Sequence, residues 1–142
     1  MGKGTTFENS LLALIFNASS ITGLAINATS SPVTNLYVSL HTADPTASGN
    51  QSTSEATYTG YARVAVARSS AGWTVTSNSV SPASTISFPA CTGGTNTITN
   101  FSIGTASSGS GQILYTGTVT PNISVASGVT PQLTTASTIT ES

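Results

Sequence analysis

The chain has 142 residues, a net charge of −1 at pH 7 and only 5% charged residues, against about 25% in average globular domains. Its polar surface is built from 24 serines and 26 threonines instead of ions. Three cations cannot neutralise the run of phosphates that gives nucleic-acid-binding proteins their affinity, so we expect no nucleic-acid partner. A hydrophobic fraction of 37% excludes a disordered tail, and a single cysteine excludes an intrachain disulfide framework. The length predicts a single domain over residues 1–142.

The first predicted element is a helix of about residues 5–17. It begins with Thr5-Thr6-Phe7-Glu8, which has the Ser/Thr-x-x-Glu spacing of a capping box. Helical spacing puts four apolar side chains on one stripe: Phe7, Leu11, Leu14 and Ile15. This stripe packs against the domain's own sheet or forms an arm that docks on a neighbouring subunit, and the spacing does not separate the two. The apolar run is much shorter than the roughly 20 residues that span a bilayer, and too short for a cleaved leader, so we expect neither a membrane partner nor secretion.

Alternation of apolar and polar residues replaces helical spacing after residue 32. In Asn35–His41 every second residue is apolar, which predicts a half-buried strand. The segment Tyr61–Arg68 alternates in the same way, with Arg63 and Arg68 on opposite faces. Each arginine is expected to pair with a carboxylate or with carbonyl groups, within the chain or across an interface.

Six further short strands are expected, separated by turn signals such as Ser81-Pro82. They are Trp73–Val75, Thr85–Phe88, Thr97–Ile103, Gln112–Val119, Ile123–Val125 and Thr130–Thr135. About eight strands at roughly 8–12-residue spacing predict an all-β fold: a jelly-roll-like antiparallel β-sandwich with a short N-terminal helix or arm. An immunoglobulin-like sandwich is the alternative.

Residues 42–57 form a long polar loop without apolar periodicity. Loops longer than about 12–15 residues are uncommon in compact domains and are mostly functional or disordered. The loop is either a contact surface or an ordinary surface loop without a function, and the sequence does not separate the two. Asp44 and Glu55 stand near its two ends, where they could approach each other at its base.

Catalytic and metal-binding patterns do not emerge from the sequence. His41, the single histidine, is expected on the polar face of its strand, bonded to a loop carbonyl, because a serine near it is unavoidable in so serine-rich a chain. The four carboxylates are scattered, so neither a hydrolytic carboxylate pair nor a metal site is predicted. Cys91 is expected to be a small buried hydrophobe. We therefore expect no enzyme, no cofactor and no metal.

The aromatic side chains have two interpretations. Trp73 and the four tyrosines could form a sugar-stacking platform, which would suit an adhesin. Aromatic side chains in β-sandwiches more often pack in the core or across strands, so core packing is the preferred interpretation.

Strand edges give the physical clue to function. Natural monomers protect exposed edges with charge, above all with lysine, but the sole lysine here is Lys3, outside every predicted strand. We expect a partner chain to cover some of these edges. A nearly uncharged all-β domain of this size therefore predicts a structural subunit of a larger assembly.

Four segments carry a resemblance to known proteins. They are Asn35-Leu-Tyr-Val-Ser-Leu-His-Thr-Ala-Asp-Pro45, Tyr58-Thr-Gly-Tyr-Ala-Arg-Val-Ala-Val-Ala-Arg68 with Trp73 after it, Ile86-Ser-Phe-Pro89 and Ile98-Thr-Asn-Phe-Ser-Ile-Gly-Thr105. In texture and order, over most of its length, the chain resembles a family of small tailed-phage virion proteins that are often labelled tail fibre proteins in prophages. It also resembles the jelly-roll cement proteins that decorate some phage heads.

The resemblance to cement proteins implies a non-enzymatic protein, made in the bacterial host cytoplasm, that binds the outer surface of the phage head over joints between major capsid subunits and stabilises the head. The implied partners are the major capsid protein and the chain itself, as a homodimer or homotrimer. Expected contact residues are Phe7, Leu11, Asp44, Glu55 and Arg63. The alternative is a tail fibre or a tail-associated receptor-binding module, and copy number separates the two.

Overall fold

The computed structural model describes residues 2–142, which form two compact units. The first unit comprises the chain up to Asn35 together with Val66–Thr85 and Thr134–Ser142, and the second comprises Leu36–Ala65 and Ile86–Leu133. The structure is mostly antiparallel β-sheet with one short N-terminal helix, which confirms the predicted all-β sandwich class. One domain over residues 1–142 stays a prediction, because compact units need not fold independently.

Helix α1 of the first unit spans Thr5–Asn17, and its N-cap is Gly4. The predicted capping box is wrong: no side chain caps the helix, and the Gly4 carbonyl accepts from the amides of Phe7 and Glu8. The buried side chains of α1 are Glu8, Leu12 and Phe16, one position beyond the predicted stripe. Among residues 2–142, no helix is long and apolar enough to cross a membrane.

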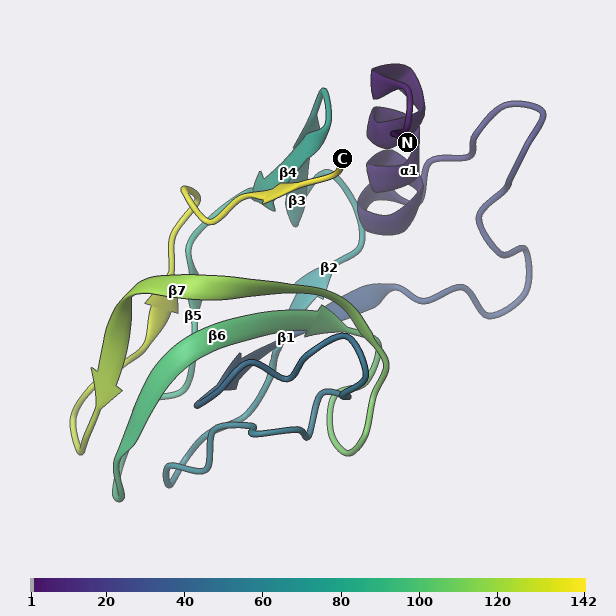
Figure 1. The fold of residues 1–142 in the computed structure, drawn as a ribbon. Helices are drawn as coiled ribbons and strands as arrows, with labels where there is room; N and C mark the ends of the chain where they lie inside the picture. Colours follow the sequence, from purple (N-terminus) through teal and green to yellow (C-terminus); the bar gives the residue numbers. More distant parts are fainter. Residues whose placement is uncertain (1) are drawn as a thin grey trace. The chain divides into compact units, whose positions relative to one another are not determined.

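The sheet of the first unit has the strand order β3-β4-β9, with β3 at Trp73–Thr76, β4 at Ser79–Pro82 and β9 at Ile139–Thr140. Helix α1 packs against β3 and β4 (Figure 1), and the rings of Phe16 and Trp73 meet edge to face with centroids 4.9 Å apart. Strands β4 and β9 were not predicted. The predicted turn at Ser81-Pro82 is wrong, because both residues pair with β3.

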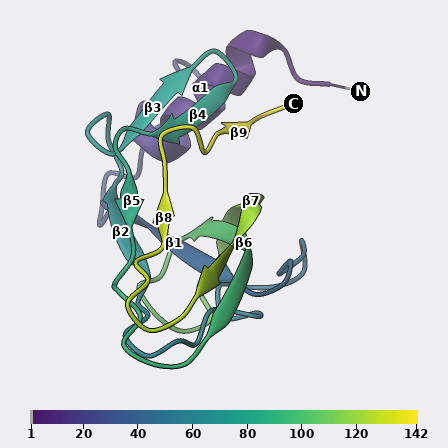
Figure 2. The ribbon, with the colours of Figure 1, turned by 90° about the vertical axis from the view of Figure 1, so that its left-hand side faces the viewer.

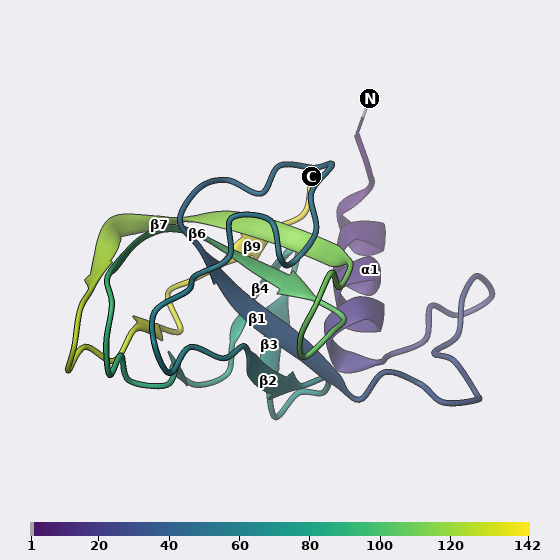
Figure 3. The same cartoon turned by 90° about the horizontal axis from the view of Figure 1, so that it is seen from below.

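The main sheet has the order β2-β1-β6-β7. Its strands are β1 at Asn35–His41, β2 at Val64–Ala67, β6 at Asn96–Gly104 and β7 at Ile113–Val125. Figure 3 shows β1, β6 and β7 side by side, and Figure 2 shows the smaller pair of β5, Ile86–Ser87, with β8, Gln132–Leu133. Two predicted strands, Gln112–Val119 and Ile123–Val125, are one strand in the structure, and the predicted strand at Tyr61–Arg68 is limited to β2.

Strand β1 is buried on both faces from Val38 to His41, so the prediction of a half-buried strand is wrong. The physical reason is that residues of the long polar loop cover its second face, where they bond to Ser39 and His41. The alternating pattern of β1 predicts that this second face is exposed to solvent. In the structure the long loop buries it, and the pattern of the strand carries no information about that loop.

Candidate functional site: two joined loops

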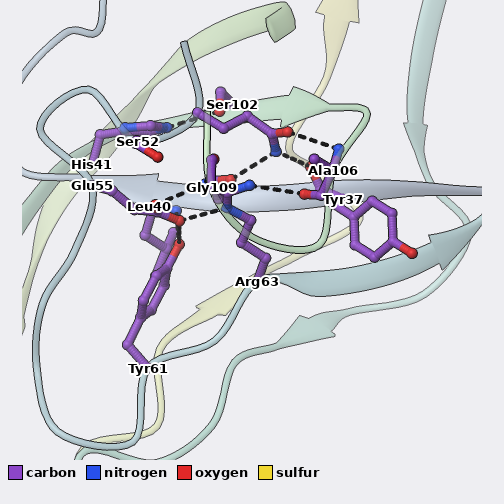
Figure 4. A network of polar contacts seen from close by, with 12 residues as sticks. Tyr37, Leu40, His41, Ser52, Glu55, Tyr61, Arg63, Ser102, Ala106 and Gly109 are labelled. Atoms are coloured by element: carbon purple, nitrogen blue, oxygen red, sulfur yellow. Dashed lines mark hydrogen bonds and ion pairs between the residues drawn. The ribbon is translucent and has the colours of Figure 1, made fainter. Parts of the chain in front are cut away.

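Two loops of the second unit lie next to each other and form the candidate site. The first is the long loop, residues 42–57, and the second is the hairpin loop, residues 105–112, which connects β6 to β7. Loops held on a rigid scaffold are where binding function concentrates. Buried polar side chains join these two loops to each other and to the main sheet (Figure 4).

An ion pair between Glu55 and Arg63 fastens the end of the long loop. Arg63 Nε lies 2.7 Å from Glu55 Oε1, and Arg63 Nη2 donates to Glu55 Oε2 at 2.9 Å, so the pair is bidentate. The Arg63 side chain is only 2% exposed and that of Glu55 is 17% exposed. Hydrogen bonds to Glu55 raise the pKa of Arg63, and the shielding from water makes this pair a fixed structural element rather than a mobile surface contact.

The same guanidinium holds the hairpin loop. Arg63 Nη1 donates to the Ala106 carbonyl at 2.9 Å, and Nη2 donates to the Gly109 carbonyl at 2.6 Å. One planar cation therefore has its donors divided between a carboxylate and two carbonyls. Because Arg63 stands just before β2, the two loops and this edge of the main sheet are connected through a single side chain.

Tyr61 extends the cluster toward β1. Its hydroxyl donates to Glu55 Oε1 at 2.9 Å and accepts from the Leu40 amide at 3.1 Å. Burial, more than any nearby charge, raises the pKa of Tyr61. The hydroxyl therefore stays protonated as the donor that Glu55 requires.

Gln51 is the second fastening, and its side chain is fully buried. Its Nε2 donates to the Tyr37 carbonyl and to Ser39 Oγ of β1, while its Oε1 accepts from the Ala106 amide at 3.0 Å. A Cβ at Gly104 or at Gly111 would collide with this amide, so two glycines make room for one glutamine. The middle of the long loop is thus bound both to the main sheet and to the hairpin loop.

His41 is the third fastening. Its Nδ1 lies 2.8 Å from the Thr53 carbonyl and its Nε2 lies 2.8 Å from Ser102 Oγ. Since a carbonyl only accepts, Nδ1 carries the proton and Ser102 donates to Nε2. Burial lowers the pKa of His41, which favours this neutral form. The predicted bond to a loop carbonyl is confirmed. His41 shares its strand face with Ser39, but that face is covered by the long loop, so His41 is fully buried.

Of the five predicted contact residues, the structure brings only Glu55 and Arg63 together, as an ion pair. Asp44 is exposed and accepts from the Thr46 amide, a local turn contact. On α1, Phe7 is exposed and Leu11 is half-buried. The contact role of all five stays a prediction.

Sequence reasoning missed Gln51, Tyr61 and the role of the hairpin loop. A lone glutamine in a polar loop carries no signal of burial. The signal that could have found the buried Gln51 was the pair Gly104 and Gly111, because a glycine in or beside a strand indicates the close approach of another group.

Trp73 and Tyr58 pack in the core, as the preferred interpretation of the aromatic side chains held. Trp73 is 1% exposed and Tyr58 is 3% exposed, so neither offers a ring face to a sugar. Cys91 is buried, as expected. Within residues 2–142, no group of three or more histidine, cysteine, aspartate or glutamate side chains could hold a metal ion.

Comparison with known proteins gives the class of the molecule. The sequence model of the family described as podophage GP4 fiber I protein gp80 matches residues 4–140. The chain belongs to this family. A search of curated proteins gave no match. The family is described by a phage fibre protein, so this member is a phage virion structural protein, in agreement with the structural class predicted from composition and edges.

Proposed function

We propose that the chain is a subunit of a phage fibre and that the two joined loops are the surface through which it contacts another protein. The observation that carries the proposal is the family match, which extends over residues 4–140 and therefore includes both loops. We therefore prefer the fibre alternative to the head-cement interpretation, which no comparison supports.

The geometry of the loops supports a contact role. Three buried side chains, Gln51, His41 and Arg63, hold the loops in one arrangement before any partner arrives. Prior ordering reduces the entropy that is lost on binding. The exposed residues of the two loops are almost all uncharged, so we expect binding to this surface to depend little on ionic strength.

The experiment that tests the fibre assignment is a measurement of copy number. Quantitative peptide mass spectrometry of purified particles gives the ratio of this chain to the major capsid protein. A ratio of a few per cent supports a fibre. A ratio near or somewhat below one would overturn it in favour of head cement, and absence from particles would overturn the virion role itself.

The contact role has its own test. Ser108→Arg adds a bulky charge at an exposed position of the hairpin loop, and Ser84→Arg adds the same charge in the turn between β4 and β5. We expect Ser108→Arg to reduce incorporation into particles or adsorption to the host while its thermal unfolding matches that of Ser84→Arg. Equal behaviour of the two variants would refute the loops as the contact surface.

A further inference from the structure

The two edges of the main sheet are protected very differently. Edge strand β2 has four residues, and a charged side chain stands at each end of it, Arg63 before and Arg68 after. Edge strand β7 has 13 residues and no charge, and the chain carries no charged residue from 69 to 140. Short length and flanking charge are two of the means by which natural sheets prevent pairing at an edge, and proline and β-bulges are others. The β2 edge is short and flanked by charge, whereas the β7 edge is long and uncharged and is interrupted only by Pro121 and by two irregularities in its register with β6.

Strand β7 offers a backbone able to pair with another strand. On one side it is paired with β6, from Asn96 opposite Val125 to Gly104 opposite Ile113. On the other side, no strand within residues 2–142 pairs with it. Every second residue of such a strand directs its N–H and C=O groups away from the sheet.

Two irregularities interrupt the register of β7 with β6, one beside Leu114 and one between Thr118 and Ile123. Pro121, in the second of them, has no N–H. The segment able to pair regularly is therefore residues 115–118, about 13 Å long.

We propose that β7 pairs antiparallel with β7 of a second copy of this chain, about a two-fold axis perpendicular to the sheet. Such an axis keeps the same face of both sheets on the same side, so exposed residues of one copy stand beside exposed residues of the other. Within the regular segment these residues are Thr116 and Thr118.

The chemistry of the strand favours an identical partner. Threonine opposite threonine is a favourable cross-strand pair, and β-branched residues suit a pleated surface. An uncharged strand meets its own copy without like-charge repulsion, whereas a charged strand would not. Self-pairing is a property of the isolated chain, so it goes beyond the proposed function and stands or falls separately from the chain's place in the virion.

The test is sedimentation of the full chain from about 1 μM to about 1 mM, a range that covers moderate to weak affinity. We expect the wild type to pass from monomer to dimer within this range. Thr116→Lys combined with Thr118→Lys places like charges opposite one another, and should raise the dissociation constant about tenfold or more at low salt. Ser84→Lys combined with Thr85→Lys adds the same charge between β4 and β5 and should leave it unchanged.

A second pair of variants makes the result independent of any loss of stability. The Lys variant and the variant with Thr116→Glu and Thr118→Glu should each dimerise poorly alone and should form a mixed dimer when combined. A wild type that stays monomeric throughout, lysine variants that dimerise like the control, or a mixture that does not associate would each overturn the proposal.

Discussion

Two arginines flank β2, and each fastens a different part of the chain. Arg63 is paired with the carboxylate of Glu55 and reaches two carbonyls of the hairpin loop. Arg68 donates only to neutral oxygens, which are the carbonyls of Leu14, Ile15 and Val33 and the side-chain oxygen of Asn27. Hydrogen bonding to Glu55 raises the pKa of Arg63, whereas burial lowers that of Arg68.

The comparison shows that the same residue type can stabilise two regions by different means. Removal of one partner of the Glu55–Arg63 pair leaves a charge in a site shielded from water, and the surroundings cannot neutralise it. Removal of Arg68 leaves carbonyls at the end of α1, and water can bind some of these. Loss of Arg63 or Glu55 should therefore destabilise the whole second unit. Loss of Arg68 should destabilise mainly α1 and the segment after it.

The segment after α1, residues 18–34, also differs from the two joined loops in its exposed side chains. Leu24 is 76% exposed and Ile26 is 70% exposed. In the long loop, by contrast, the apolar side chain Ala56 and the polar Gln51 are both buried. Arg68 holds this segment at Asn27 and Val33 without an internal buried anchor of the kind that Gln51 provides.

The largest effect is expected from Glu55→Gln, which leaves Arg63 charged and without its carboxylate. We expect the free energy of unfolding to fall by about 3–5 kcal/mol, measured by urea denaturation. Asp44→Asn is the matched control, because Asp44 is exposed, and it should change stability by less than about 1 kcal/mol.

A double-mutant cycle sharpens this result. Glu55→Gln combined with Arg63→Met should cost less than the sum of the two single changes, because no charge is left unpaired. Additive costs would show that the ion pair is not the source of the effect.

Arg68→Met should cost about 2 kcal/mol, less than Glu55→Gln, since the oxygens left behind are neutral. Amide hydrogen exchange should become faster at the end of α1 and in residues 18–34, while the two joined loops keep their protection. Lys3→Met is the control: its ion pair with Glu141 is partly exposed and contributes little. Faster exchange in the long loop of Arg68→Met would contradict the separation of the two regions.

The His41 contact predicts a pH dependence of stability. The pKa of His41 in the folded chain lies below the ordinary 6.5 of the unfolded chain. Below pH 6.5 the unfolded chain therefore binds a proton that the folded chain does not, and stability is lost as the pH falls, by at most about 1.4 kcal/mol per pH unit. Urea denaturation between pH 7.5 and about 5.5 measures the slope. The slope should be absent in His41→Asn, and an equal slope there would assign it to other groups.

The smallest effect concerns the C-terminal end of α1, which Arg68 holds from outside. Ala18 has φ 56°, a left-handed conformation that is unfavourable for residues with a Cβ. Ala18→Gly should raise the free energy of unfolding by up to about 1 kcal/mol. Ala13→Gly, inside the helix, should lower it by about 1 kcal/mol, and thermal unfolding of both variants distinguishes the two positions.

The sequence determined the class of fold and the bounds of helix α1 and strand β1. Helical spacing over residues 5–17 and alternation in Asn35–His41 are local patterns, and the elements found there have those bounds. Local pattern did not find β4 and β9, because each is short and is defined by pairing with a strand elsewhere: Ser79 with Thr140 and Val80 with Ile139.

The candidate site divides in the same way. From the sequence, Glu55 and Arg63 were expected as contact residues, and each arginine was expected to pair with a carboxylate or with carbonyl groups. Glu55 and Arg63 are only 8 positions apart, but Arg63 also reaches Ala106 and Gly109. Tertiary structure decided those two bonds, because they join residues 43 and 46 positions apart.

Composition alone determined that the surface of the protein is nearly uncharged and rich in hydroxyl groups. Only the tertiary structure decided which strand edge is left without charge or partner strand, and which polar side chains are buried. The physical reason is that burial and edge position depend on long-range pairing. Alternation, capping signals and turn residues report only on the few residues next to them.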